Sequence, residues 1–333
     1  NLLGTLGVLG NADLFFLNPN GIVFGPEANL DISGSFTAST AESSAWADGQ
    51  HFSAINPEIP PLLTLSTTPG LQFGQTASPI TQAGDLTVGQ DIIMAAGELI
   101  MSGQLSAGET LTLSALGKIN VQGPVTGNLI TVQASDLFVT DGGLLEISTA
   151  SDGLSGNLTI LADDLVVFRG ENEQTGEISG AYNRVDPDTT EDAGNILISA
   201  NRLELLNGAL ISASTRGDGN AGQVTLRASD SVLISGEDSV GLGSGVFSQV
   251  GSAGKGNAGG ILVETGTLII EEGGELTVNT LGQGDAGLLK IIASDTVSID
   301  GSSRRGLESG AFSRVGSSRA RGDAGGVEIE TGS

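Results

Sequence analysis

The sequence predicts an all-β protein that folds as a parallel β-helix, a solenoid with about 19–38 residues per coil. Short runs rich in Val, Ile and Leu alternate with polar residues, a Gly-containing motif recurs along the chain, and no run has helical apolar spacing. Alternation with period two gives a strand one buried and one solvated face, whereas a surface helix needs apolar residues at i, i+3 and i+4. Because parallel strands need long crossover connections and no helix is available to make them, we expect each strand to stack on its counterpart in the next coil.

The recurring motif is a small residue followed by Gly, placed just before an apolar run. It begins at residues 83, 107, 126, 155, 193, 221, 258, 286 and 324, with spacings of 24, 19, 29, 38, 28, 37, 28 and 38 residues. After residue 126 a short unit alternates with a long one, so the pattern is a double unit of 65–66 residues. The landmarks Gly180-Ala-Tyr, Gly245-Val-Phe and Gly310-Ala-Phe also lie 65 residues apart.

Each unit is predicted to contain three strands. In one short unit these are Asn195–Ser199, Arg202–Leu206 and Ala209–Ser214, separated by turns at Ala-Asn and Asn-Gly and followed by a loop over 215–220. Insertions in the long units, such as Gly236–Ser244 and Asp300–Ser309, are predicted to leave after the second strand and to project laterally. Long surface loops cost little extra closure entropy and often carry binding surfaces.

The N-terminal part has a different composition, which places a boundary near residue 79. Seven of the nine Pro, six of the ten Phe and the only Trp lie at or before it, so we expect one segment over 1–79 and the β-helix repeats over 80–333. Within the first segment, Asn18-Pro19-Asn20-Gly21 separates the apolar runs Leu14–Leu17 and Ile22–Phe24. Asn, Pro, Asn and Gly in this order favour a type I turn, so a tight turn is predicted to join two strands.

Composition excludes several functional classes. With 13 Lys+Arg against 39 Asp+Glu, the net charge of -26 excludes a nucleic-acid-binding protein. The absence of Cys excludes a disulfide scaffold and thiol-ligated metal or redox sites. The sequence contains no uninterrupted stretch of about 18 apolar residues, so no transmembrane helix is predicted. The opening residues lack the features of a signal peptide. We interpret the chain as a mature or truncated piece of a longer protein.

Residues 10–39, which read Gly-Asn-Ala-Asp-Leu-Phe-Phe-Leu-Asn-Pro-Asn-Gly-Ile-Val-Phe-Gly-Pro-Glu-Ala-Asn-Leu-Asp-Ile-Ser-Gly-Ser-Phe-Thr-Ala-Ser, carry a family resemblance. They resemble the haemagglutination-activity domain of filamentous haemagglutinin-like exoproteins, the TpsA partners of two-partner secretion. Leu62–Leu65 and Gly70–Gly74 are similar to the end of that domain in its cyanobacterial-type versions.

The resemblance implies a right-handed, single-stranded parallel β-helix, with residues 1–79 as the C-terminal part of the haemagglutination-activity or TPS secretion domain. It also implies export through an outer-membrane TpsB barrel and a secreted, cell-surface adhesin that contacts an unidentified receptor or glycan. The element Asn18, Pro19, Asn20, Gly21 and Ile22 corresponds to the family's Asn-Pro-Asn-Gly-Ile motif, which is implicated in secretion. The family's upstream Asn-Pro-Asn-Leu motif does not occur in this sequence.

Two tripeptides, Arg216-Gly217-Asp218 and Arg321-Gly322-Asp323, spell the integrin-type cell-attachment signal. The loops that we take as equivalent read Gln283-Gly-Asp and Lys255-Gly-Asn, so the position before Gly varies freely among polar residues. Gly-Asp and Gly-Asn are ordinary turn residues, and the turn interpretation is therefore favoured over cell attachment.

Candidate catalytic and metal residues are sparse. Parallel β-helices also host polysaccharide lyases and hydrolases with paired carboxylates, and Asp163-Asp164 is the best pair, although neighbours on a regular strand point to opposite faces. His51 is the only histidine. Weak Ca²⁺ binding by the acidic residues stays open, although Glu271-Glu272 and Asp186-x-Asp188 are interpreted first as solvated loop charge. Together with the adhesin role that the resemblance implies, this predicts a non-catalytic, adhesin-like rod without a cofactor. A carbohydrate-active β-helix enzyme and a passive cell-surface structural protein remain the alternatives.

Overall fold

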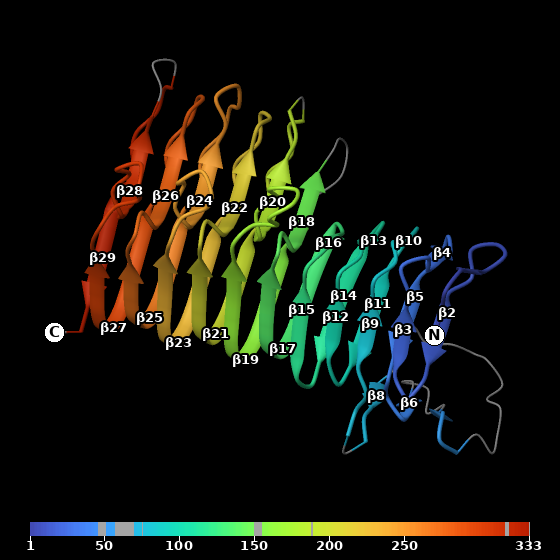
Figure 1. The fold of residues 1–333 in the computed structure, drawn as a ribbon. Coiled ribbons are helices and arrows are strands. Elements are labelled where there is room, and N and C mark those ends of the chain that lie inside the picture. The colour runs from blue at the N-terminus through green and yellow to red at the C-terminus, as the bar shows by residue number, and fades with distance from the viewer. Residues whose placement is uncertain are drawn as a thin grey trace.

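The protein is an elongated rod of stacked β-strands. The computed structural model describes residues 1–45, 51–56, 70–74, 76–149, 155–187, 189–316 and 320–332. All secondary-structure elements in these residues are β-strands. The chain runs from its N-terminus at one end of the rod to its C-terminus at the other (Figure 1). None of the described elements is a helix able to span a membrane.

Two parallel sheets form the faces of the rod. One has nine strands, in the order β10 (Leu86–Val88), β13 (Leu105–Ala107), β16 (Pro124–Thr126), β18 (Leu144–Thr149), β20 (Gly180–Val185), β22 (Leu210–Thr215), β24 (Gly245–Val250), β26 (Glu275–Thr280) and β28 (Gly310–Val315). The other has fifteen strands, and each pairs with strands one coil away (Figure 1). The predicted parallel β-helix is thus confirmed.

The three-strand unit is correct only for the earlier coils. There β14 (Thr110–Ala115), β15 (Lys118–Val121) and β16 are separate strands, but β17 (Leu129–Thr140) pairs with both β14 and β15. From that point the first two strands of each coil are one long strand. The remaining long strands are β19 (Leu158–Arg169), β21 (Ile196–Leu206), β23 (Val224–Ser235), β25 (Ile261–Ile270) and β27 (Leu289–Ile299), while β29 (Val327–Thr331) is shorter.

The turn predicted at Ala200-Asn201 is therefore wrong. Strand β21 passes through it with a register irregularity between Ala200 and Arg202, opposite the next strand, β23. An extra residue at such a bulge bends a strand and increases its twist without ending the pairing on either side. The rod's corner is made by a bent strand instead of a turn.

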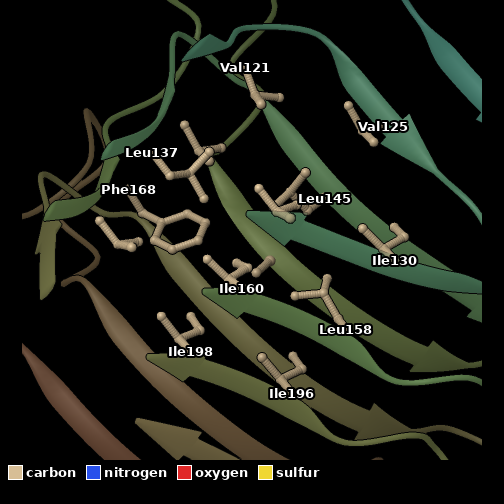
Figure 2. Close-up of a cluster of buried hydrophobic side chains, with 14 of the residues drawn as sticks. Val121, Val125, Ile130, Leu137, Leu145, Leu158, Ile160, Phe168, Ile196 and Ile198 are labelled. Carbon is tan, nitrogen blue, oxygen red and sulfur yellow. The ribbon is translucent and has the colours of Figure 1, made fainter. Parts of the chain in front are cut away.

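Aliphatic side chains fill the interior, as the alternating pattern predicts. Figure 2 shows inward-pointing Ile130, Leu158 and Ile196 from three successive coils, packed beside Leu145 of the opposite sheet and Phe168. Each of these five side chains is fully buried. Successive coils thereby form one continuous core along the rod, stabilised by about 25 cal/mol per Å² of apolar surface removed from water.

The glycine of the repeated small-residue/Gly pair allows successive coils to approach closely at one corner of the rod. Gly156, Gly194 and Gly222 stack at one corner, and a Cβ built on Gly194 or Gly222 would lie well inside 3.0 Å of the preceding glycine's carbonyl oxygen. None of the three has φ in the left-handed region. These positions need Gly because successive backbones approach too closely for a side chain.

The double unit reflects how neighbouring coils close a second corner. In a short coil, Asn207 (φ 58°) and Gly208 (φ 85°) make a tight left-handed turn. The insertion of the next coil ends at Ser244, whose buried hydroxyl accepts a hydrogen bond from the Gly208 N–H at 2.9 Å. The same arrangement recurs with Gly142 and Ser179, and with Gly273 and Ser309. A short coil and the long coil after it therefore form one structural pair.

The N-terminal segment continues the same stack of strands. Strand β5 (Phe36–Ser39) pairs with β2 (Leu14–Leu17) and with β11 (Ile92–Ala96), while β3 (Ile22–Phe24) pairs with β9 (Ile80–Gln82). The core therefore continues without a break past residue 79, and the domain boundary there stays a prediction.

An antiparallel sheet that the sequence analysis did not anticipate branches from this segment. It consists of β6 (Ser43–Ala45) between β7 (His51–Ser53) and β8 (Gly70–Gln72). Strand β8 lies within the predicted Gly70–Gly74 match, whereas Trp46 and Leu62–Leu65 lie outside the described residues.

Candidate functional site

The Asn18–Ile22 element forms the predicted turn. The Gly21 N–H donates to the Asn18 carbonyl oxygen at 3.2 Å, which closes the four-residue turn. The Asn18 side chain makes two further bonds, because its Oδ1 accepts from the Asn20 N–H (3.1 Å) and its Nδ2 donates to the Gly21 carbonyl oxygen (3.0 Å). Gly21 has φ of 99°, a conformation that disfavours any other residue. The Asn20 side chain is exposed, and Ile22 is buried.

Residues far away in sequence hold this turn in place. The Ser78 hydroxyl donates to the Pro19 carbonyl oxygen at 2.7 Å, and the Ile22 N–H donates to the Pro79 carbonyl oxygen at 3.2 Å. The turn is therefore a rigid corner of the rod, anchored on the chain that begins the next coil.

The two Arg-Gly-Asp tripeptides occupy different positions in the stack of coils. The sequence analysis took them as equivalent because they have the same sequence, and this was wrong. Arg321 pairs in register with Gln283, and Gln283 pairs with Lys255. Lys255 in turn forms an ion pair with Asp218 at 2.8 Å, so the counterpart of Arg321 in that loop is Asp218 and not Arg216. The two tripeptides are thus offset by two residues in the stack, because the register is set by the stacking of the coils and not by the tripeptide sequence.

A ladder of Asn and Asp side chains sets that register. The N–H of Asn257 donates to Oδ1 of Asn220, that of Asp285 to Oδ1 of Asn257, and that of Asp323 to Oδ1 of Asp285, each at 2.8 Å. The ladder begins with the Asn220 N–H, which donates to Oδ1 of Asp192 at 2.6 Å. Asp323 therefore takes part in the ladder, and whether either tripeptide binds cells stays a prediction.

The candidate catalytic pair lies in solvent. Asp163 and Asp164 are both exposed, contrary to the expected alternation, because the register between β19 and β21 is irregular between Leu161 and Leu165. Hydrogen bonds from Asn201 (3.3 Å) and Arg202 (3.4 Å) hold the pKa of the Asp164 carboxyl below its ordinary value. A carboxyl that acts as a general acid near neutral pH needs the opposite shift.

Other titratable residues also lack the geometry of a metal site. In the described part of the chain, no three His, Asp or Glu side chains are grouped so that they could hold a metal ion. His51 is exposed on the antiparallel sheet, Glu272 accepts a hydrogen bond from Ser235, and Asp188 lies outside the described residues.

The insertions leave between the second and third strands of their coils, as predicted, and they contact one another along the rod. The preceding long unit carries an insertion over residues 170–179, between β19 and β20. The Ser239 N–H donates to Oε1 of Glu171 in that insertion at 3.0 Å. Glu237 forms an ion pair with Arg304 of the following insertion, and Arg304 also donates to the Asp238 carbonyl oxygen at 3.0 Å. The insertions together make a continuous ridge beside the nine-stranded sheet.

A row of aromatic rings lies on the outer face of this sheet, and the sequence analysis did not assign it a role. Tyr182, Phe247 and Phe312 occupy the same register position on every second strand. A Cβ on the glycine two residues earlier in each strand would strike the ring, so each ring lies over a glycine. The 65-residue recurrence of Gly-x-aromatic was the signal for this row, but recurrence alone does not tell which way a side chain points.

The rings separate three adjoining hollows that together form a furrow along the rod. The first (about 280 Å³) includes Pro124 and Tyr182, and the second (about 350 Å³) lies between Tyr182 and Phe247. The third (about 510 Å³) lies between Phe247 and Phe312, and Leu242 and Leu307 of the insertion ridge line it. The furrow therefore runs from β16 to β28 beside the ridge.

Residues 1–160 match the family model of the TPS secretion domain. Among solved structures, the chain is similar to the crystal structure of the HMW1 secretion domain from Haemophilus influenzae, with a TM-score of 0.61 and 17% sequence identity. That match covers 96% of this chain and 80% of the other, and at this identity it shows the fold. Comparison with curated proteins finds no match. Residues 1–160 thus carry a TPS secretion domain, which supports a TpsA-type exoprotein of two-partner secretion and implies a TpsB transporter as its export partner.

Proposed function

We propose that this exoprotein is a non-catalytic, adhesin-like rod that is displayed at the cell surface after export. The observation that carries the proposal is the furrow beside the insertion ridge, an elongated surface with aromatic rings suited to binding a receptor or glycan. The furrow begins at Pro124, within the secretion domain, and the β-helix carries most of it beyond residue 160. A net charge of -26 keeps an exposed rod soluble and opposes self-association.

The non-catalytic part of the proposal is supported by the carboxylates. Asp163 and Asp164 are exposed, and the lowered pKa of Asp164 disfavours the protonated form that an acid catalyst needs. Incubation with acidic polysaccharides should release no reducing sugar. Release that disappears in the Asp164→Asn variant would contradict this part.

We further propose that the Asn18–Ile22 turn is a contact for the TpsB transporter. Support comes from the rigidity of the turn and from Asn20. The backbone N–H of Asn20 takes part in the turn, whereas its side-chain amide is exposed. The structural role of Asn18 and the proposed contact role of Asn20 can therefore be separated by experiment. Asn20→Ala should retain the turn and lower secretion, whereas Asn18→Ala removes two hydrogen bonds of the turn itself.

The test is co-expression of the chain, within its full-length precursor, with the cognate TpsB protein. Secreted and cell-associated chain would be measured by immunoblotting, and accessibility to protease on intact cells would report surface display. Ser53→Ala, on the antiparallel sheet, is the control substitution. Normal secretion of Asn20→Ala would refute the proposed contact, and a chain found only in the medium would refute surface display.

A further inference from the structure

The three rings of the furrow differ in what covers them. The two outer rings lie under arginine side chains, and the central ring does not. The guanidinium of Arg184 lies over the Tyr182 ring with its carbon 3.8 Å from the ring centroid, and that of Arg314 lies over the Phe312 ring at 3.5 Å. The corresponding residue beside Phe247 is Gln249, which carries no charge. Tyr182 is 5% exposed under its arginine, whereas Phe247 is half-buried and borders two hollows.

The spacing along the furrow is regular. Each ring is two strands from the next, and strands of a sheet are about 4.8 Å apart, so the rings repeat at about 10 Å along the rod. This distance is comparable with the length of two linked pyranose rings in an extended chain. Between the rings, in the same register, lie Ser212, which is half-buried, and Thr277, which is buried and donates its hydroxyl proton to Oε2 of Glu275 at 2.7 Å. Flat apolar faces alternating with hydrogen-bonding groups are features of a ligand site.

The charges in the furrow are balanced. Arg184 pairs with Glu146 at 3.2 Å, and Arg314 approaches Glu275 at 3.9 Å, while the chain as a whole carries a charge of -26. An anionic ligand would be repelled by the chain, and a cationic one would meet the guanidinium groups of Arg184 and Arg314 over two of the rings. A neutral ligand with many hydroxyls matches this surface, because guanidinium groups donate hydrogen bonds in a plane without requiring a counter-charge.

We propose that the furrow binds an extended neutral polysaccharide of β-linked pyranoses that runs along the rod, with one sugar stacked on Phe247 and the second sugar on either side of it hydrogen-bonded by Arg184 or Arg314. β-Linked pyranoses form extended chains whose axial C–H groups make apolar faces that stack on aromatic rings. The proposal rests on the proposed adhesin function and names the ligand class of that surface.

The experiment is isothermal titration of the purified chain with cellohexaose, xylohexaose and mannohexaose, and with α-linked maltohexaose, which coils, as the control ligand. At least one β-linked probe should bind, and Phe247→Ala should weaken its affinity about tenfold, while Phe247→Tyr should retain it. Arg184→Gln with Arg314→Gln should also weaken it about tenfold. The matched control is Phe138→Ala, because Phe138 is a half-buried ring on the other sheet with Lys118 5.8 Å from its centroid.

Binding of none of the β-linked probes, equal binding of maltohexaose, or equal losses in Phe247→Ala and Phe138→Ala would overturn the proposal. Phe247-dependent binding of a protein in place of these sugars would also overturn it. Because the titration uses purified chain, sugar binding by a chain that is absent from the cell surface would refute only the proposed surface display. Surface display without sugar binding would refute only this inference.

Discussion

The stacked corner glycines allow a quantitative test of how closely the coils are packed. We consider Gly222→Ala. The new Cβ would lie about 1 Å inside the 3.0 Å limit of real Cβ contacts, against the carbonyl oxygen of Gly194. That atom belongs to backbone, so it cannot rotate away as a flexible side chain would, and the two coils must separate locally.

The cost follows from the hydrogen bonds beside this contact. The Ala193 N–H to Asn220 O bond is 2.8 Å and the Ile196 N–H to Gln223 O bond is 3.0 Å, so a separation of about 1 Å stretches both beyond hydrogen-bonding range. At about 0.5–1.5 kcal/mol net for each bond, Gly222→Ala should lower the free energy of unfolding by about 1–3 kcal/mol. Overpacking substitutions in protein cores cost a similar amount.

Urea denaturation followed by circular dichroism would measure this change. The control is Gly4→Ala, because a Cβ on Gly4 meets no atom within 4 Å and its φ is ordinary. If Gly222→Ala unfolded at the same urea concentration as Gly4→Ala, the close approach of the backbones would not be what requires glycine, and the argument would fail.

Two further predictions concern the buried hydroxyls and the aromatic row. Ser244→Ala leaves the buried Gly208 N–H without its acceptor and should lower the free energy of unfolding, measured by urea denaturation, by about 1–3 kcal/mol. Ser214→Ala, on the outer face, is the control and should lower it little. Equal losses in the two variants would disprove a coupling of paired coils. Burial raises the pKa of Tyr182 above its ordinary 10.0, so the stability linked to this group is complete below pH 10 and is lost as pH rises through the folded pKa. Because Tyr182 is the only tyrosine, phenolate absorbance reports it directly: Arg184→Gln should raise its pKa further, and a folded pKa at or below 10.0 would show that the ring is solvated.

The fold could be predicted from sequence because its information is local and repeated. Alternation within strands identified the inward side chains, such as Ile196 and Leu205, and the small-residue/Gly spacing marked one corner of each coil. The Asn18–Gly21 turn followed from the conformational preferences of four adjacent residues, as its closing hydrogen bond confirms. For each of these features, a few neighbouring residues are sufficient to specify the conformation.

Features that depend on how one coil sits on the next were decided only by the tertiary structure. The bend of β21 at Ala200 replaced a predicted turn, and the ladder through Asn220 and Asn257 showed that Arg216 and Arg321 are not equivalent. The furrow around Phe247 likewise depends on rings that are 65 residues apart in sequence. By itself, then, the sequence determined the β-helix, its repeat and its tightest turn. Register and the surface that register creates required the structure, because they depend on hydrogen bonds and packing between coils that no local pattern specifies.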